Sequence, residues 1–290
     1  MIEKLARAEA ESISQKTITE CGFVAFPICP FEIAKRHEIH VEPKESTQPG
    51  VSGFLMRVGD TFGIKYASQI ANEGFQRFTV AHELGHYFLP GHAEALFPSG
   101  TGIHHSSFLS TDPLERQADW FASVLLMPEF LFKKAVDRAG YGFSAIEKLS
   151  LLCKASILAT AIRFTQFTDD AVALIVSTGN KVEYCFMSER IKSLPGITWI
   201  KKGTLVPSNS TTSRFNKIAN NIESAQHAEG ACHLDLWFDG APDVEVNEDV
   251  DVRESRSRVV RLECLQYVLW IIDEIQDVGR VLPGMSPIQS

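Results

Sequence analysis

The chain has 290 residues, of which 44% are hydrophobic, 22% charged and 10% aromatic, so it can bury a sizeable core and is neither disordered nor fibrous. Its 28 basic and 36 acidic residues give a net charge of −8, which leaves no overall basic field for nucleic acid or an anionic membrane. The six cysteines form no C-x-x-C pair, and neither a signal segment nor a membrane-spanning helix is expected from the sequence. We therefore expect a cytoplasmic protein with reduced thiols and no membrane partner.

Helical spacing and turn residues predict the elements of the front half in chain order. A hairpin is expected around Gly59-Asp60, and the stretch between Pro90-Gly91 and residue 111 is expected to be a loop. The predicted elements are helices at 2–20 and 31–35, strands at 54–58 and 61–66, a helix at 75–89, and a helix from Asp112-Pro113 to Pro128.

Two further helices are predicted at 144–152 and 155–167, after which the pattern becomes mixed. Around Gly179-Asn180 the sequence predicts a second hairpin. The expected elements of this part are strands at 171–177, 181–187, 232–238 and 246–252 and a helix near 267–276. The change near residue 168 predicts a mainly helical front domain, residues 1–168, and a smaller α+β domain, residues 169–290.

Five of the nine histidines lie between positions 82 and 105, and two of them belong to the motif His82-Glu83-Leu84-Gly85-His86. Histidines at i and i+4 on a helix share one face and can bind one metal ion. Glu83 lies about 100° round the helix, where it can reach a water on the metal. Zn²⁺ lowers the pKa of such a water and the carboxylate takes its proton, so the motif predicts metal-assisted hydrolysis.

A catalytic zinc needs a third protein ligand, and two residues compete for that role. His92 has the right distance from His86, but Leu89 stands where the corresponding metalloprotease motif has glycine. Glu115 lies one turn into the next helix, although it could instead form a capping box with the helix start. We predict Glu115 as the ligand and Asp119, four residues later, as the carboxylate that orients a ligand histidine.

Residues 78–86 (FTVAHELGH) and 115–128 (ERQADWFASVLLMP) are similar to the ImmA/IrrE family of metallopeptidases, with weaker matches at 30–34 and 51–54. The resemblance implies an α+β fold: a zincin-like minimal catalytic domain whose helices at 144–167 are helix-turn-helix-like, then a smaller, GAF-like α+β domain. It also implies a gluzincin-like zinc site with a glutamate as third ligand, which by motif is Glu115; Mn²⁺ or another divalent metal is the alternative cofactor.

By the same resemblance, the expected partner is a helix-turn-helix transcriptional repressor, which family members cleave to switch on stress, phage-defence or mobile-element genes. Substrate or oxyanion contacts are expected among Tyr66, His92, His104 and His105, and the strand 62–66 is expected to bind an extended peptide by strand addition. The smaller domain is expected to hold the substrate or to sense a small-molecule or nucleic-acid signal.

A regulatory protein that binds DNA or a signal, with a non-proteolytic zinc site, is the alternative. The second helix of the helix-turn-helix-like segment contains only Arg163 as a basic residue, with Lys154 at its edge. Groove recognition needs more basic and amide side chains, so direct DNA binding is not expected. A metallo-endopeptidase remains the prediction because a structural zinc site has no use for Glu83.

Overall fold

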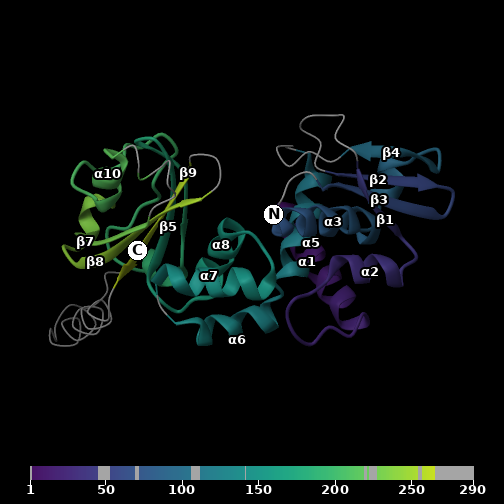
Figure 1. Cartoon of the computed structure of the whole chain (residues 1–290), viewed down its shortest axis with the longest axis horizontal. Helices are drawn as coiled ribbons and strands as arrows, with labels where there is room; N and C mark the ends of the chain where they lie inside the picture. Colours follow the sequence, from purple (N-terminus) through teal and green to yellow (C-terminus); the bar gives the residue numbers. More distant parts are fainter. Residues whose placement is uncertain are drawn as a thin grey trace, which may run out of the picture. The chain divides into compact units, whose positions relative to one another are not determined.

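The structure is a computed structural model that describes residues 2–44, 53–68, 72–105, 112–140, 142–218, 221, 227–253 and 257–264. Internal contacts divide the chain into two compact units (Figure 1). The first comprises Met1–Gly140 and Ser144–Thr160, and the second comprises Tyr141–Phe143 and Ala161–Ser290. Both units mix helices and strands, which confirms the α+β class. No helix in the described ranges is long and apolar enough to cross a membrane.

The first unit holds a four-stranded sheet and most of the helices. Its elements are α1 (Ile2–Glu20), α2 (Pro30–Arg36), β1 (His40–Lys44), β2 (Gly53–Val58), β3 (Thr61–Ala67), α3 (Glu73–Phe88), α4 (His92–Leu96), β4 (Thr101–His105), α5 (Pro113–Leu126) and α6 (Glu129–Ala139). The helices α7 (Gly142–Cys153) and α8 (Ile157–Phe167) run across the division between the units. The predicted hairpin is confirmed, with Gly59 in its turn at φ +61°, a value that glycine adopts without strain.

The sheet has the strand order β1-β3-β2-β4, in which β1 and β3 are parallel and the other pairs antiparallel. Strand β3 therefore has a hydrogen-bonded neighbour on each side. The expectation that residues 62–66 add a substrate strand is wrong, because this segment has no free edge. Strand β1, at the edge of the sheet, continues through Pro43 to Lys44.

Helices α3 and α5 form the packed layer beneath the sheet, with α3 against β2 and β3 and α5 beside α3 (Figure 1). Asn72 caps α3 by accepting the N–H of Phe75 at 3.0 Å, and Asp112 caps α5 by accepting that of Leu114 at 2.8 Å. These caps satisfy N–H groups that have no partner inside the helix. Fully buried side chains at this layer include Leu55, Ile64, Val80, Leu84 and Phe121.

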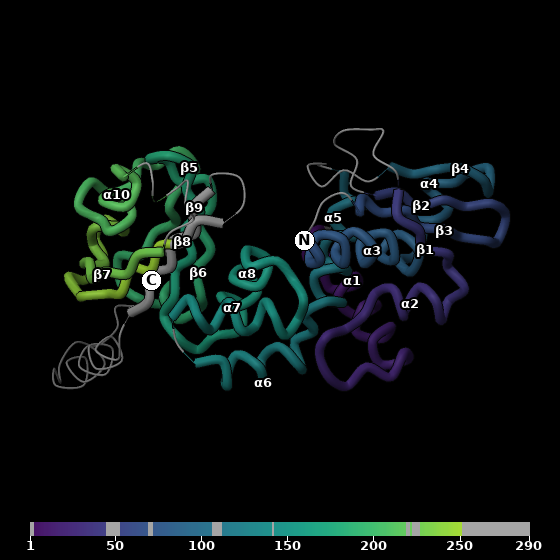
Figure 2. The backbone as a smooth tube through the Cα atoms, viewed as in Figure 1, coloured from purple at the N-terminus to yellow at the C-terminus, as the bar shows by residue number. Residues whose placement is uncertain are grey.

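The stretch after residue 90 was expected to be a loop, but part of it forms regular secondary structure. It contains α4, which starts after Gly91 in the left-handed conformation, and β4, which pairs with β2. Figure 2 shows the chain passing from α3 through α4 to β4. Composition did not predict β4 because its pairing partner lies more than 40 residues earlier. Helix α6, which begins directly after Pro128, was also not predicted.

The second unit is built on an antiparallel five-stranded sheet with the order β6-β5-β9-β8-β7. Its elements are β5 (Val172–Thr178), β6 (Lys181–Met187), α9 (Glu189–Lys192), α10 (Thr211–Asn216), β7 (His227–His233), a 3₁₀ turn (Leu234–Leu236), β8 (Glu245–Arg253) and β9 (Ser257–Cys264). The hairpin β5–β6 and strand β8 are confirmed. The predicted strand 232–238 is wrong beyond His233, and β9 was not predicted. The helix near 267–276 lies outside the described residues.

Candidate metal centre

Three side chains from two helices meet in the interior of the first unit. Helix α3 presents His82 and His86 one turn apart, with their Nε2 atoms 3.1 Å from each other. Glu115 of α5 places Oε1 3.2 Å from His86 Nε2 and Oε2 3.5 Å from His82 Nε2. The exposed fraction of each residue is 5% or less. Two imidazoles and one carboxylate thus converge in a buried position.

The spacing of these donor atoms fits a tetrahedral metal ion. Zinc bound by nitrogen and oxygen at about 2.0–2.2 Å separates two of its ligand atoms by about 3.3 Å. The two Nε2 atoms are 3.1 Å apart, and those of His86 and His82 lie 3.2 and 3.5 Å from different oxygens of Glu115, so each distance is close to this value. His82, His86 and Glu115 can therefore hold Zn²⁺ with little movement, and they provide the three protein ligands that are typical of a catalytic zinc.

Each histidine has a different partner on its second ring nitrogen. His82 Nδ1–H donates to Asp119 Oδ1 at 2.9 Å, the contact that would orient a metal-binding imidazole. His86 Nδ1 instead lies 3.1 Å from Nδ1 of His92, which is the first residue of α4 and is buried. His92 thus lies behind His86, where it is neither a loop residue nor in a position to contact a substrate.

The environments of the group separate the pKa values of its members. Burial opposes a charge on His82, but hydrogen bonds to Asp119 and Glu115 outweigh burial and raise the pKa of His82 to about 9. Burial dominates at His86 and lowers its pKa to about 4. Burial would raise the pKa of Glu115, but hydrogen bonds from His104 and His82 hold it well below its ordinary value. The carboxylate is therefore ionised at neutral pH.

Glu83 is fully buried on α3 next to strand β2. A Cβ atom at Gly53 of β2 would lie 3.2 Å from Glu83 Oε1 and only 2.4 Å from Thr79 Cγ2. The absence of a side chain at Gly53 thus lets the sheet approach the part of α3 that carries Glu83. Its charge also contributes to the raised pKa of His82.

Of the other predicted contacts, the structure brings His104 to the group. His104 Nε2 lies 2.7 Å from Glu115 Oε1, and its ring centroid is 4.9 Å from that of His86. Neighbouring residues of a strand point to opposite faces, and His105 accordingly lies against Phe54. Tyr66 packs edge-on against Phe31 of α2.

Sequence analysis did not identify Gln117. It lies two residues after Glu115, about 200° round α5, so helical spacing assigns it to another face. Its side chain nevertheless reaches His92, whose Nε2 lies 3.2 Å from Gln117 Oε1. The contact between Gln117 and His92 could not be predicted, because α4, the helix that brings His92 to this position, was not predicted.

Lys154 and Arg163, the basic residues considered for DNA contact, both have partners within their own units. Lys154 pairs with Glu73 at 2.8 Å. Arg163 has an exposed fraction of 7%, donates to Gln166 Oε1 at 2.8 Å and lies 4.5 Å from the ring centroid of Phe167. These contacts agree with a role in packing.

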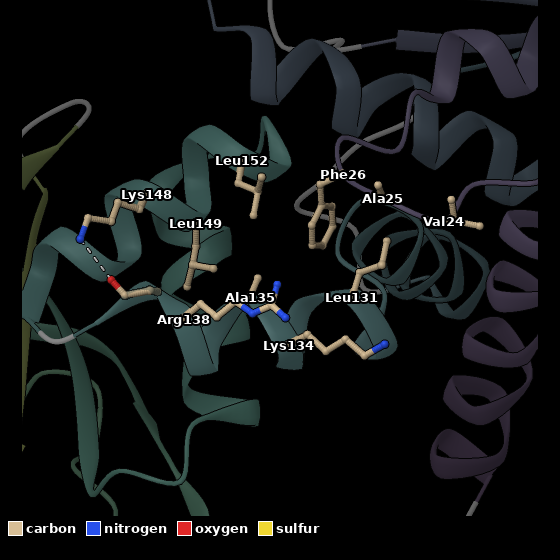
Figure 3. A pocket seen from close by; sticks show the side chains of 11 residues that line it. Val24, Ala25, Phe26, Leu131, Lys134, Ala135, Arg138, Lys148, Leu149 and Leu152 are labelled. Atoms are coloured by element: carbon tan, nitrogen blue, oxygen red, sulfur yellow. Dashed lines mark hydrogen bonds between the residues drawn. The ribbon is translucent and has the colours of Figure 1, made fainter.

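Two further features include none of the residues of the buried group. His233, Asp235 and Asp243 bring possible ligand atoms together in the second unit, but all three residues are exposed. The first unit also contains a largely apolar pocket of about 550 Å³. Figure 3 shows that its side chains come from the segment after α1 and from helices α6 and α7, and that Lys148 donates to a backbone carbonyl at its edge, that of Ala139. None of the three buried metal-binding candidates lines this pocket.

Comparison with known proteins identifies the region that contains the buried group. Residues 34–165 match the family model described as the IrrE N-terminal-like domain. No curated protein matches the chain. Among solved structures, a Mycobacterium tuberculosis transcriptional regulator is similar, with a TM-score of 0.56, 12% identity, and coverage of 91% of this chain and 82% of that chain. At this identity the likeness concerns the fold alone.

Proposed function

Residues 34–165 belong to the ImmA/IrrE family of metallopeptidases, and on this premise we propose that the protein is a zinc-dependent endopeptidase acting on a specific protein. The observation that carries the proposal is the buried convergence of His82, His86 and Glu115 on two helices, with the carboxylate of Glu83 on the same helix as both histidines. The donor set suits zinc, and Mn²⁺ or another divalent ion is the alternative.

Each residue of the site has a separate role in this proposal. His82, His86 and Glu115 hold the ion, which supplies Lewis acidity for hydrolysis when bound. Glu83 removes a proton from the attacking water and later delivers it to the departing amine. Asp119 fixes the orientation of His82. His104 is the candidate for stabilising the oxyanion, because its imidazole reaches the group and 21% of its side chain is exposed.

Strand β4 is the best candidate for presenting the substrate backbone. Among the described strands it forms one edge of the sheet, and it carries His104 next to Glu115. An edge strand offers unpaired N–H and C=O groups to an extended peptide. Strand addition at β4 would therefore bring a peptide bond towards the metal group, a role that β3 cannot fulfil.

The proposed substrate is a helix-turn-helix transcriptional repressor whose cleavage switches on stress, phage-defence or mobile-element genes. The family assignment supports this choice, and the similar solved structure is named a transcriptional regulator. The second unit, with its own sheet and core, would hold the substrate or sense an inducing small molecule or nucleic acid.

A substrate trap tests the proposal. Tagged Glu83→Gln protein, expressed in the native host, is expected to retain zinc and to co-purify with an intact repressor. Wild-type protein should cut that repressor, whereas Glu83→Gln and the metal-free Glu115→Ala variant should not. Regulation by a non-proteolytic zinc site would instead leave the function of Glu83→Gln intact and the bound partner uncut.

A further inference from the structure

A chain of hydrogen bonds behind the metal centre connects α1 to His86. The Gln117 amide nitrogen donates to the carbonyl oxygen of Ala6 at 3.4 Å. The Gln117 amide oxygen lies 3.2 Å from His92 Nε2. His92 Nδ1 then lies 3.1 Å from His86 Nδ1. These contacts involve one residue each from α1, α5, α4 and α3.

The first contact fixes the direction of every later one. A backbone carbonyl can only accept hydrogen bonds, so the amide nitrogen of Gln117 must face Ala6 and its oxygen must face His92. An amide oxygen also only accepts, so His92 Nε2 must carry the hydrogen. When His92 is neutral, its Nδ1 then has a lone pair, and His86 Nδ1–H donates to it.

We infer that Gln117 and His92 are positioning residues that hold His86 in the tautomer with its hydrogen on Nδ1. In that tautomer the Nε2 lone pair of His86 faces His82 and Glu115, as metal binding requires. The two histidines of the motif are thus oriented by different means: a carboxylate acts on His82 and a neutral imidazole on His86. The inference rests on the proposed role of His86 as a metal ligand.

A neutral relay, formed by Gln117 and His92, suits a site that already holds the three carboxylates of Glu83, Glu115 and Asp119. A further carboxylate behind His86 would add negative charge beside Glu115, whereas the imidazole and amide add none. The relay also makes the metal site depend on α1, because Ala6 determines which way the Gln117 amide points. Changes in α1 that displace the Ala6 carbonyl are therefore expected to weaken metal binding from outside the site.

Nuclear magnetic resonance of protein labelled with ¹⁵N-histidine tests the tautomers directly. Long-range ¹H–¹⁵N spectra of the full chain, with and without zinc, should show a hydrogen on Nδ1 of His86 and on Nε2 of His92. A hydrogen on Nδ1 of His92 in the wild-type protein would overturn the inference. This readout needs no substrate and no activity, so it remains decisive even if the trap experiment fails.

Zinc affinity gives a second readout. Gln117→Met keeps the size of the side chain but removes the acceptor, and His92→Phe keeps the ring but removes the relay. Each is expected to raise the zinc Kd by about 10–100-fold, whereas Lys133→Met, at an exposed position of α6, should leave it unchanged. Asp119→Asn should shift the resonances of His82 and not the tautomer of His86. Wild-type zinc affinity in both relay variants would contradict the inference.

Discussion

His82 and His86 are the same residue type on one face of one helix, yet their environments give them opposite acid–base behaviour. Hydrogen bonds to Asp119 and Glu115 raise the pKa of His82 to about 9, whereas burial lowers that of His86 to about 4. Without metal, His82 therefore carries a proton at neutral pH and His86 does not. Both must be neutral to bind a metal ion.

The pKa of His82 predicts that zinc affinity rises with pH. Because zinc must displace the proton of His82, the zinc Kd should fall by about tenfold for each pH unit up to about pH 9. The stability of the metal-free protein should change with pH in the opposite direction to zinc affinity. The proton on His82 stabilises the folded state fully below pH 6.5, and this stabilisation is lost as the pH rises through 9. Competition with a chromophoric chelator between pH 6.5 and 8.5 measures the effect.

Asp119→Asn provides the control, because removing the carboxylate lowers the pKa of His82 and should flatten the pH dependence. A zinc Kd that does not change between pH 6.5 and 8.5 in the wild-type protein would show that His82 is neutral before zinc binds.

The residues that the structure brings together as a possible metal group could be predicted because their spacing carries the chemistry. His82, Glu83 and His86 form a motif in the sequence. For Glu115 the sequence leaves two roles open, a metal ligand or the partner of Asp112 in a capping box, and only the contacts in the structure distinguish them. In the structure Asp112 accepts the N–H of Leu114, and Glu115 points to the imidazoles. Gln117 and the orientation of His104 could not be predicted, since both depend on elements brought together by the fold.

At the scale of elements, the crossing of α3 and α5 determines whether the metal donors can meet. A Cβ atom at Gly85 would lie 3.0 Å from Ala118 Cα and 3.2 Å from its carbonyl oxygen. Both atoms belong to the backbone of α5, which cannot rotate away as a side chain can. Gly85 therefore permits the close approach that places Glu115 beside His82 and His86.

Gly85→Val should force the two helices apart. Overpacking of this kind costs about 1–3 kcal/mol in the free energy of unfolding, and zinc affinity should also fall because the donors lie on both helices. Denaturant unfolding and zinc titration measure the two effects. Arg116→Val, at an exposed position of α5, controls for a β-branched residue in a helix. Unchanged zinc affinity in Gly85→Val would show that the crossing tolerates a side chain.

The hairpin β2–β3 offers a matched pair of glycines. Gly53→Ala would place Cβ 2.4 Å from Thr79 Cγ2 and 3.2 Å from Glu83 Oε1, so it should reduce the rate of substrate cleavage. Gly63→Ala meets the flexible end of Met56 first, at 3.2 Å, and should be tolerated. Cleavage rates and thermal unfolding of the two variants test this; equal rates would show that Gly53 has no role beside Glu83.

The sequence predicted those elements that are determined by residues close to them in the chain. The cap of α5 and the glycine turns of both hairpins could be recognised. Strands β4 and β9 and the position of β7 could not, because distant partners stabilise them. The alternation around His233 predicted a longer strand, but Leu234–Leu236 forms a 3₁₀ turn in which Leu234 is fully buried.

At the scale of the whole molecule, the charge of −8 predicts little affinity for DNA. The three basic residues of the helix-turn-helix-like segment reinforce this, since Lys148 donates to the carbonyl of Ala139, Lys154 pairs with Glu73 and Arg163 is buried. Fluorescence anisotropy with duplex DNA should show no specific, salt-dependent binding between 50 and 200 mM salt, roughly the range over which phosphate contacts are lost. Nanomolar binding that falls steeply with salt would favour the DNA-binding alternative.

The near-complete burial of the metal donors has a kinetic consequence. His82 and His86 expose none of their surface and Glu115 only 5%, so a chelator could approach an ion held between them only from the open side that a substrate must also use. Local opening of α3 or α5 is the other route by which the ion could leave. Release that rises in proportion to chelator concentration would indicate the open side, whereas a plateau would indicate opening of the helices. If the open side is the route, a peptide bound there should slow the loss of zinc, so metal release would measure access to the reaction site.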